Sequence, residues 1–171
     1  MAGCHLVNKH EIKYIEGDEA LLDQIKPLWE ALNRYHLGLS LNFKQFYLDM
    51  TFPKRKADLL KKAALGKMRI SIAIDQVSGQ NVGYCISGIN NERMGEIKSI
   101  FVSETYRHRG IGEVLMQKAL DWLEKQGALE KIVEVTAGNE KAWGFYAHYG
   151  FLPRKTMLKQ IKKPKTSNST C

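Results

Sequence analysis

The residues best suited to chemistry lie in the stretch 95–112, which reads GEIKSIFVSETYRHRGIG. Its β-branched first part predicts a strand, and a polar loop then leads into a helical pattern. Unpaired amides at a helix start carry partial positive charge, so a glycine-containing loop there suits a phosphate group. Gly110 and Gly112 would let backbone approach an anion, and Arg107 and Arg109 add charge. An ordinary strand-to-helix turn explains the loop equally well.

Two familiar phosphate-binding motifs do not match this loop. The dinucleotide-binding fingerprint requires a third glycine at position 115, where the chain has Leu115. The lysine of a Walker loop is also missing. A meander of strands before the loop is the wrong context for both motifs, so the sequence argues against both.

The first part of the chain predicts helices before any paired strands. Asp18 can cap a helix whose apolar stripe ends at Leu32. Within that stripe, Pro27 predicts a kink or a second helix with proline in its first turn. The pattern then changes to alternation, which predicts an antiparallel meander. The expected elements are a strand at 11–15, a loop at 35–41, helical turns at 42–50, a helix at 57–65, and strands at 68–75 and 81–89.

The second part predicts a strand, a helix and a second strand. Because such crossovers are right-handed, the strands ending near Val102 and Thr136 are expected to be parallel neighbours. A mixed sheet with helices on both faces follows. The expected elements are a helix at 111–126, a strand at 131–136, a last helix capped by Asn139 and stopped by Gly150, a strand at 151–161 and a polar, disordered tail at 162–171.

Two blocks of this half resemble the GCN5-related N-acetyltransferase (GNAT) family. Arg-x-x-Gly-x-Gly at 107–112 is similar to the family's acetyl-CoA pyrophosphate loop, and NEKAWGFYAHYGF at 139–151 is similar to its second motif. The resemblance is specific over 95–151. It implies an α/β (α+β) fold with a mixed, mostly antiparallel sheet of six to seven strands, helices on both faces and a splayed parallel central strand pair. One such domain is expected over 1–161.

The resemblance implies an acetyl-CoA-dependent N-acetyltransferase that moves an acetyl group to a primary amine by direct attack in a ternary complex. The pyrophosphate would be bound by loop amides, and the pantetheine arm would lie beside the central strand like an extra strand. An unpaired N–H at Ile100 would then meet the thioester oxygen. The cofactor-binding residues implied are Ile100, Phe101, Val102, Arg107, His108, Arg109, Gly110, Ile111, Gly112, Asn139 and Tyr146.

By the same resemblance, Tyr146 is the general acid for the departing thiolate. A phenol pKa near 10 and a thiol pKa near 8.5 make that transfer uphill by about 2 kcal/mol. The protein must therefore lower the pKa of the phenol, or the hydrogen bond must form as charge develops. A purely structural core tyrosine is the alternative.

The general base is less clearly marked. Glu96 stands where some family members carry a catalytic glutamate, and it would need burial or an intervening water to act. A solvent-facing glutamate at a strand end is the alternative, and His36, Glu134 and His148 are further candidates. Asn139 has two interpretations, as a contact to the cofactor arm and as a helix cap.

Composition sets wider limits on function. The chain has 171 residues, a formal charge of +8 and three widely spaced cysteines, which fit neither a disulfide framework nor a metal-ligand motif. No apolar run is long enough to cross a bilayer, and the N-terminus lacks a signal-peptide core, so we expect a cytoplasmic protein. Much of the excess positive charge lies in 54–67 and 155–165, and no nucleic-acid-binding motif accompanies these basic residues.

Three hypotheses stay open at this stage. The first is the acetyltransferase, acting on a small amine, an aminoglycoside, or a protein lysine or N-terminus. The second is a non-catalytic acyl-CoA-binding module on the same fold. The third is a basic nucleic-acid-binding domain, which would bind with a steep salt dependence. A homodimer is compatible with the resemblance.

Overall fold

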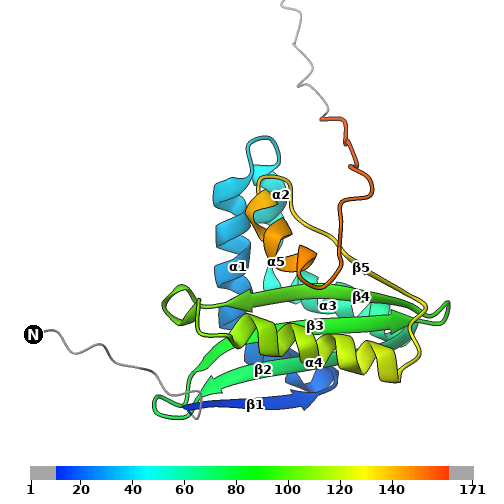
Figure 1. Cartoon of the computed structure of the whole chain (residues 1–171). Coiled ribbons are helices and arrows are strands. Elements are labelled where there is room, and N and C mark those ends of the chain that lie inside the picture. The colour runs from blue at the N-terminus through cyan, green and yellow to red at the C-terminus, as the bar shows by residue number, and fades with distance from the viewer. Residues whose placement is uncertain (1–10, 162–171) are drawn as a thin grey trace, which may run out of the picture.

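A computed structural model of the chain describes residues 11–161. A five-stranded sheet with the strand order β1-β2-β3-β4-β5 forms its centre (Figure 1). The first four strands pair antiparallel in sequence, and β4 and β5 pair parallel. The strands are β1 (Ile12–Gly17), β2 (Gly66–Asp75), β3 (Asn81–Asn90), β4 (Met94–Val102) and β5 (Glu130–Val133). The tail at 162–171, predicted to be disordered, lies outside the described residues.

Helices cover both faces of this sheet. Helix α4 packs on one face, and α1 and α3 pack on the other (Figure 1). The predicted mixed, mostly antiparallel sheet with helices on both faces is therefore confirmed. The helices are α1 (Lys26–Leu39), α2 (Lys44–Asp49), α3 (Phe52–Ala64), α4 (Ile111–Lys125) and α5 (Trp143–Ala147), and the 3-10 turns are η2 (Glu19–Ile25), η3 (Glu104–Tyr106) and η4 (Glu140–Ala142).

Each face of the sheet has its own apolar core because side chains alternate along a strand. In β2, Ile70 and Ile72 are fully buried against α1 and α3, while Ala73 is fully buried against α4. From α4, Leu115 and Leu123 are fully buried on the second face. Full burial of one such aliphatic side chain stabilises the fold by about 1.5–3 kcal/mol.

The start of α1 follows the predicted pattern. The Asp18 carboxylate accepts a hydrogen bond from the Ala20 amide at 3.0 Å and caps η2. Pro27 then lies in the first turn of α1, where its missing N–H leaves no hydrogen bond unmade. The expected second helix beginning with proline is confirmed.

The predicted loop at 35–41 is wrong over most of its length. Helix α1 continues to Leu39, and the amide of Ser40 still donates to the carbonyl of His36 at 3.0 Å. Gly38 favours a break only weakly, by about 1 kcal/mol relative to alanine. Contacts made by Tyr35 and His36 with a distant segment hold this last turn in place.

Helix α3 begins earlier than the predicted 57–65. It starts at Phe52, which is buried and packs against Trp29 with ring centroids 5.6 Å apart. Pro53 lies in its first turn, a position that proline favours. The sequence pattern missed this turn because a buried aromatic residue, and no helical stripe, anchors it.

The predicted final strand at 151–161 is also wrong, and this accounts for the lower strand number. The segment has no regular structure in the described residues. Pro153 cannot donate to a sheet ladder, and Met157 and Leu158 are 87% and 92% exposed. Strand β5, which would be its neighbour at the sheet edge, has only four residues.

The parallel pair predicted between the strands near Val102 and Thr136 is confirmed, and it is short. The ladder runs from Met94 opposite Glu130 to Ile97 opposite Val133. Strand β4 then continues to Val102 while β5 has already ended. The two chains therefore separate along the second half of β4, as expected for a splayed pair.

Candidate active site

The loop between β4 and α4 presents free backbone amides. Within residues 11–161, the amides of His108, Arg109, Gly110, Ile111 and Gly112 have no hydrogen-bond partner. The amide of Arg107 differs, since it donates to the carbonyl of Glu104 at 3.2 Å. Helix α4 makes its first bond from Val114 to the Gly110 carbonyl at 3.1 Å. A run of free donors at the start of a long helix can bind an anion.

The two glycines of this loop differ in backbone conformation and surroundings. Gly110 is the N-cap of α4 with φ = 78°, a left-handed conformation that glycine adopts without strain. No atom lies within 4 Å of an added Cβ there, so the backbone conformation, and not packing, favours glycine. A Cβ on Gly112 would lie 3.6 Å from the Phe145 ring, which is ordinary van der Waals contact, so packing does not require glycine at this position.

Arg107 lies across the end of β4. Its Nε donates to the Val102 carbonyl at 3.2 Å. Its guanidinium carbon is 5.8 Å from the Phe101 ring centroid and 5.7 Å from that of Tyr35 on α1. Arg109 points elsewhere, with its guanidinium 5.0 Å from the ring of Tyr106. Both arginines therefore keep positive charge beside the loop, held by aromatic rings.

The second half of β4 offers main-chain groups on the edge that faces away from β3. The Ser103 amide donates to Val82 on the β3 side, and hydrogen-bonding direction alternates along an antiparallel strand. Ile100 and Val102 consequently direct their N–H groups towards the β5 side, where the ladder has stopped. An extended ligand could pair with this edge as a strand does.

Tyr146, on α5, lies in the core shared by α4 and this part of β4. Its ring centroid is 5.4 Å from that of Phe145, and in the described residues its hydroxyl has no hydrogen-bond partner. Burial, the larger cause, and the nearby Cys85 thiol raise the pKa of Tyr146 to about 12. Because Cys85 pairs with Ile100 across β3 and β4, the phenol lies near the unpaired half of β4.

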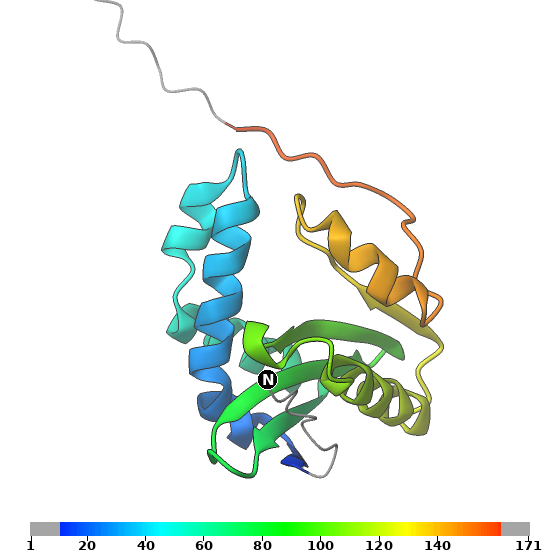
Figure 2. The same ribbon diagram turned by 60° about the vertical axis from the view of Figure 1, so that its left-hand side comes forward.

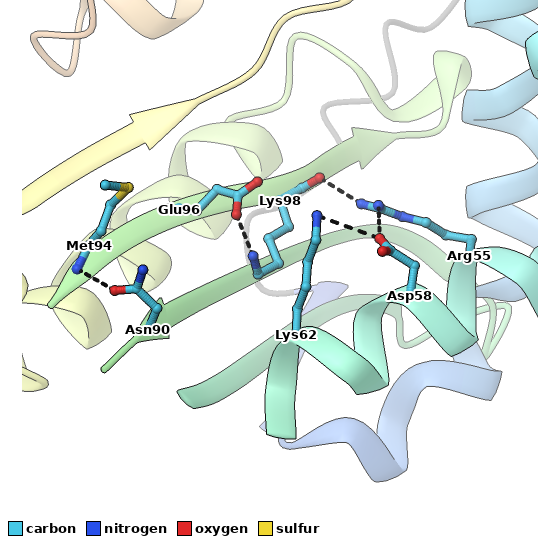
Figure 3. Close-up of polar contacts among 7 residues, drawn as sticks. All are labelled: Arg55, Asp58, Lys62, Asn90, Met94, Glu96 and Lys98. Atoms are coloured by element: carbon cyan, nitrogen blue, oxygen red, sulfur yellow. Dashed lines mark hydrogen bonds and ion pairs between the residues drawn. The ribbon is translucent and has the colours of Figure 1, made fainter. Parts of the chain in front are cut away.

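Glu96 lies on the face of β4 that α3 covers (Figure 3). Its carboxylate forms an ion pair with Lys98, whose side chain is only 10% exposed. The Lys98 carbonyl in turn accepts from the Arg55 guanidinium at 3.1 Å. Glu96 and Lys98 line a cavity of about 250 Å³ together with Lys62 and Lys67. The carboxylate is therefore accessible, but a cation already engages it.

A second polar group, at the end of α1, joins the segment that follows β5. The Tyr35 hydroxyl donates to the Asn139 side chain at 3.3 Å. His36 Nδ1 lies 3.5 Å from Thr136 Oγ1, and the Tyr47 hydroxyl donates to the same oxygen at 3.4 Å. The Asn139 side chain makes no cap hydrogen bond to η4, although the residue stands at that N-cap position.

The other candidate bases lie away from this group. His148 is exposed directly after α5, and its Nδ1 contacts the Gly144 carbonyl of that helix at 2.6 Å. Glu134 is exposed just after β5.

Sequence reasoning missed Tyr35, Tyr47 and Thr136 entirely. The only local signal for them was a pair of aromatic side chains, Tyr35 and His36, at the end of an amphipathic helix.

The described residues thus form a mixed sheet whose parallel strand pair separates beside a helix start with free amides, an architecture that can hold an extended ligand with an anionic group. The chain belongs to the acetyltransferase (GNAT) family, since a sequence model of that family matches residues 30–151. An N-acetyltransferase of Methanocaldococcus jannaschii described as uncharacterized is 34% identical over 99 residues, which is 52% of this chain and 43% of that one. One from Archaeoglobus fulgidus is 30% identical over 103 residues, covering 54% of this chain and 69% of that one. The match to the first relative thus spans less than half of its length.

Solved structures support the fold. A GCN5-related N-acetyltransferase from Ralstonia eutropha superposes with a TM-score of 0.66 at 19% identity, over 88% of this chain and 98% of that one. An aminoglycoside N-acetyltransferase in complex with CoA gives a TM-score of 0.62 at 16% identity, over 90% of this chain and 95% of that one. Separately, none of the helices within 11–161 has the length and apolarity needed to cross a bilayer.

Proposed function

We propose that this protein is an acetyl-CoA-dependent N-acetyltransferase that acetylates a primary amine by direct attack in a ternary complex. The observation that carries the proposal is the run of free amides from His108 to Gly112, which lies beside the unpaired half of β4. One surface can thus receive both the anionic and the extended part of the same ligand.

The loop would hold the diphosphate of acetyl-CoA. Free N–H groups at the start of α4 and the helix dipole favour negative charge there. The guanidinium groups of Arg107 and Arg109 add to the positive potential of the loop. The pantetheine arm would extend from the loop along β4 and hydrogen-bond its main chain between Ile100 and Val102.

The N–H of Ile100 would stabilise the reaction itself. As the amine attacks, negative charge develops on the thioester oxygen, and a donor already aimed at that position requires no rearrangement. One such donor contributes on the order of 3 kcal/mol to catalysis. The burial of neighbouring Cys85 and Tyr84 supports a site with little competing water.

Tyr146 would donate a hydrogen bond to the departing sulfur. With a pKa raised to about 12, the phenol stays protonated at neutral pH. Complete transfer of the phenol proton to the thiolate would be easier with a lowered pKa, whereas the pKa of Tyr146 is raised. Against a thiol pKa near 8.5, full transfer would be uphill by about 5 kcal/mol. We therefore assign Tyr146 a hydrogen bond that strengthens as charge builds on sulfur.

The described cysteine supports direct attack over an acyl-enzyme route. Cys85 is 1% exposed, and burial raises the pKa of its thiol to about 12. At neutral pH such a thiol is almost entirely protonated and is a poor nucleophile. The acetyl group would thus pass straight from sulfur to the nitrogen of the amine.

A thiol-release assay tests the proposal. Acetyl-CoA is mixed with the protein and, in separate wells, with spermidine, kanamycin, a peptide with one lysine and a blocked N-terminus, and a peptide with a free N-terminus. Release of free CoA that depends on the amine supports the transferase. Thermal stabilisation by acetyl-CoA without CoA release in any well would favour the non-catalytic binding module. Absence of both effects would contradict the cofactor site itself.

A further inference from the structure

The last turns of α1 contact the protein on both sides of the unpaired half of β4. On one side, the Tyr35 ring lies beside the Arg107 guanidinium, whose Nε binds the Val102 carbonyl. On the other side, His36 Nδ1 lies 3.5 Å from Thr136 Oγ1. These contacts hold the His36 imidazole over the space between β4 and the segment after β5. Figure 2 shows α1 and the β5–α5 segment standing opposite each other above the sheet.

The register of the parallel pair relates this position to the acetyl group. Ile97 lies opposite Val133 in the last pair of the ladder, and beyond it β4 continues through Ile100 while the other chain continues to Thr136. The two chains have separated by then, and the space between them is the proposed acetyl site. His36, on the helix that covers one face of the sheet, contacts Thr136 at the β5 side of that space, and the Ile100 N–H is directed towards the same side.

The surroundings of the His36 ring suit a proton acceptor. The titratable or charged groups that contact it are Tyr47 of α2 and Tyr35 of α1, at ring distances of 5.9 and 6.0 Å, and Arg107 lies beyond Tyr35. The segment after β5 contributes the neutral Thr136. Burial lowers the pKa of His36, so the imidazole is neutral at pH 7. Its Nε2 has no hydrogen-bond partner in the described part of the chain.

We propose that His36 is the general base that deprotonates the acceptor amine, an inference that rests on the proposed function. One proton passes from the alkylammonium to the imidazole, and then to solvent. The freed lone pair forms the C–N bond as the C–S bond breaks. The second proton of the nitrogen ends on the departing sulfur, to which Tyr146 is hydrogen-bonded, so the products are an N-acetyl amine, free CoA and the one proton released to solvent.

His36 suits this role better than Glu96 does. The Glu96 carboxylate is already paired with Lys98, so a cation occupies the position that an alkylammonium would need. An imidazole ordinarily titrates close to neutral pH, where a general base is most effective. The Thr136 hydroxyl can orient the ring through Nδ1 and leave Nε2 for the amine.

The test is the pH dependence of kcat/KM, measured by CoA release with whichever probe amine the thiol-release assay finds. For wild-type protein, kcat/KM should rise with increasing pH below pH 6.5, which gives the pH profile a rising limb. In His36→Asn, this limb should disappear and kcat/KM at pH 7 should fall on the order of 100-fold, with the Kd for acetyl-CoA within twofold. Thr136→Val should keep the limb with a smaller loss, and the exposed control His148→Asn should match the wild type.

Each alternative outcome is decisive. If wild-type protein releases no CoA with any probe amine, the proposed function fails and the role of His36 fails with it. If wild-type protein is active and His36→Asn keeps both the limb and the rate, only the His36 assignment is overturned. Loss of the limb in Glu96→Gln instead would assign the base to Glu96. If His36→Asn melts below the assay temperature, His36→Gln replaces it. Separately, if kcat/KM of the wild-type protein does not rise with pH below pH 6.5, the His36 assignment is contradicted.

Discussion

Ile97 and Val133 form the last residue pair of the parallel ladder between β4 and β5. Beyond this pair, β4 continues to Val102 with its outer edge unpaired. Main-chain N–H groups without a protein partner are costly where they are also shielded from water. The proposed cofactor would satisfy them, so the point where the ladder ends sets where the thioester would lie.

Removal of the Ile100 N–H tests this directly. Ile100→Pro eliminates the donor, whereas Ile100→Ala shortens the same side chain and keeps it. Because the N–H faces away from β3, the antiparallel ladder needs no bond from it. We expect kcat of the proline variant to fall about 100-fold or more below that of the alanine variant in the thiol-release assay. Equal rates in the two folded variants would argue against this donor.

Gly110→Ala should weaken acetyl-CoA binding beyond its effect on stability. Gly79→Ala is a matched control, since Gly79 has φ = 69° in the turn between β2 and β3 and also has open space around it. Both changes should cost about 1 kcal/mol of unfolding free energy, from left-handed strain. Calorimetry should show a lower affinity for acetyl-CoA only in Gly110→Ala. The same affinity loss in both would remove the loop from the binding site.

Tyr146→Phe should lower turnover and leave cofactor affinity nearly unchanged. The variant loses only the hydroxyl, which has no hydrogen-bond partner in the described residues, so the fold should be retained. We expect kcat to fall on the order of 100-fold. Tyr149→Phe is the control, because Tyr149 packs against the same Phe145 ring at 5.4 Å. A Tyr146→Phe enzyme as fast as the control would leave Tyr146 with a structural role.

Stability should fall in mild acid through His36. Its pKa is lowered in the folded state by burial, so the unfolded chain binds the proton more readily. The stabilisation from the neutral ring is therefore complete above about pH 6.5 and is lost as the pH falls through the folded pKa. Urea unfolding between pH 7.5 and 5.5 should show a smaller decrease for His36→Asn than for wild type. Parallel curves would mean that the ring is solvated.

Glu16 should stabilise the contact between α4 and the edge of the sheet. Its carboxylate forms ion pairs with Lys118 of α4 and Arg69 of β2. Burial alone would raise the pKa of Glu16, but the two hydrogen bonds outweigh it and the pKa is lowered. Glu16→Gln should cost about 1 kcal/mol at low salt and less at high salt. Glu92→Gln, which removes the same charge from an exposed turn, should cost almost nothing in the same urea titration.

Periodicity along the chain was enough to predict the central elements of the fold. Alternation in 68–75 and 81–89 identified β2 and β3, and the apolar stripe in 111–126 identified α4 within one residue at its end. The order strand, helix, strand was enough to predict the parallel pair, because crossovers have one hand. The resemblance added the splay between β4 and β5, which no local pattern of residues encodes.

The sequence by itself determined local structure. The periodicity of apolar side chains required strands and helices, and glycines suited to a left-handed conformation required turns. Only the tertiary structure decided that α1 extends past Gly38, that residues 151–161 find no strand partner, and that His36 meets Thr136, 100 residues later in the chain. Such contacts join segments whose own patterns carry no information about each other. They depend on how the helices pack on the sheet, and that packing brings the His36 imidazole to Thr136, beside the separated part of the parallel pair.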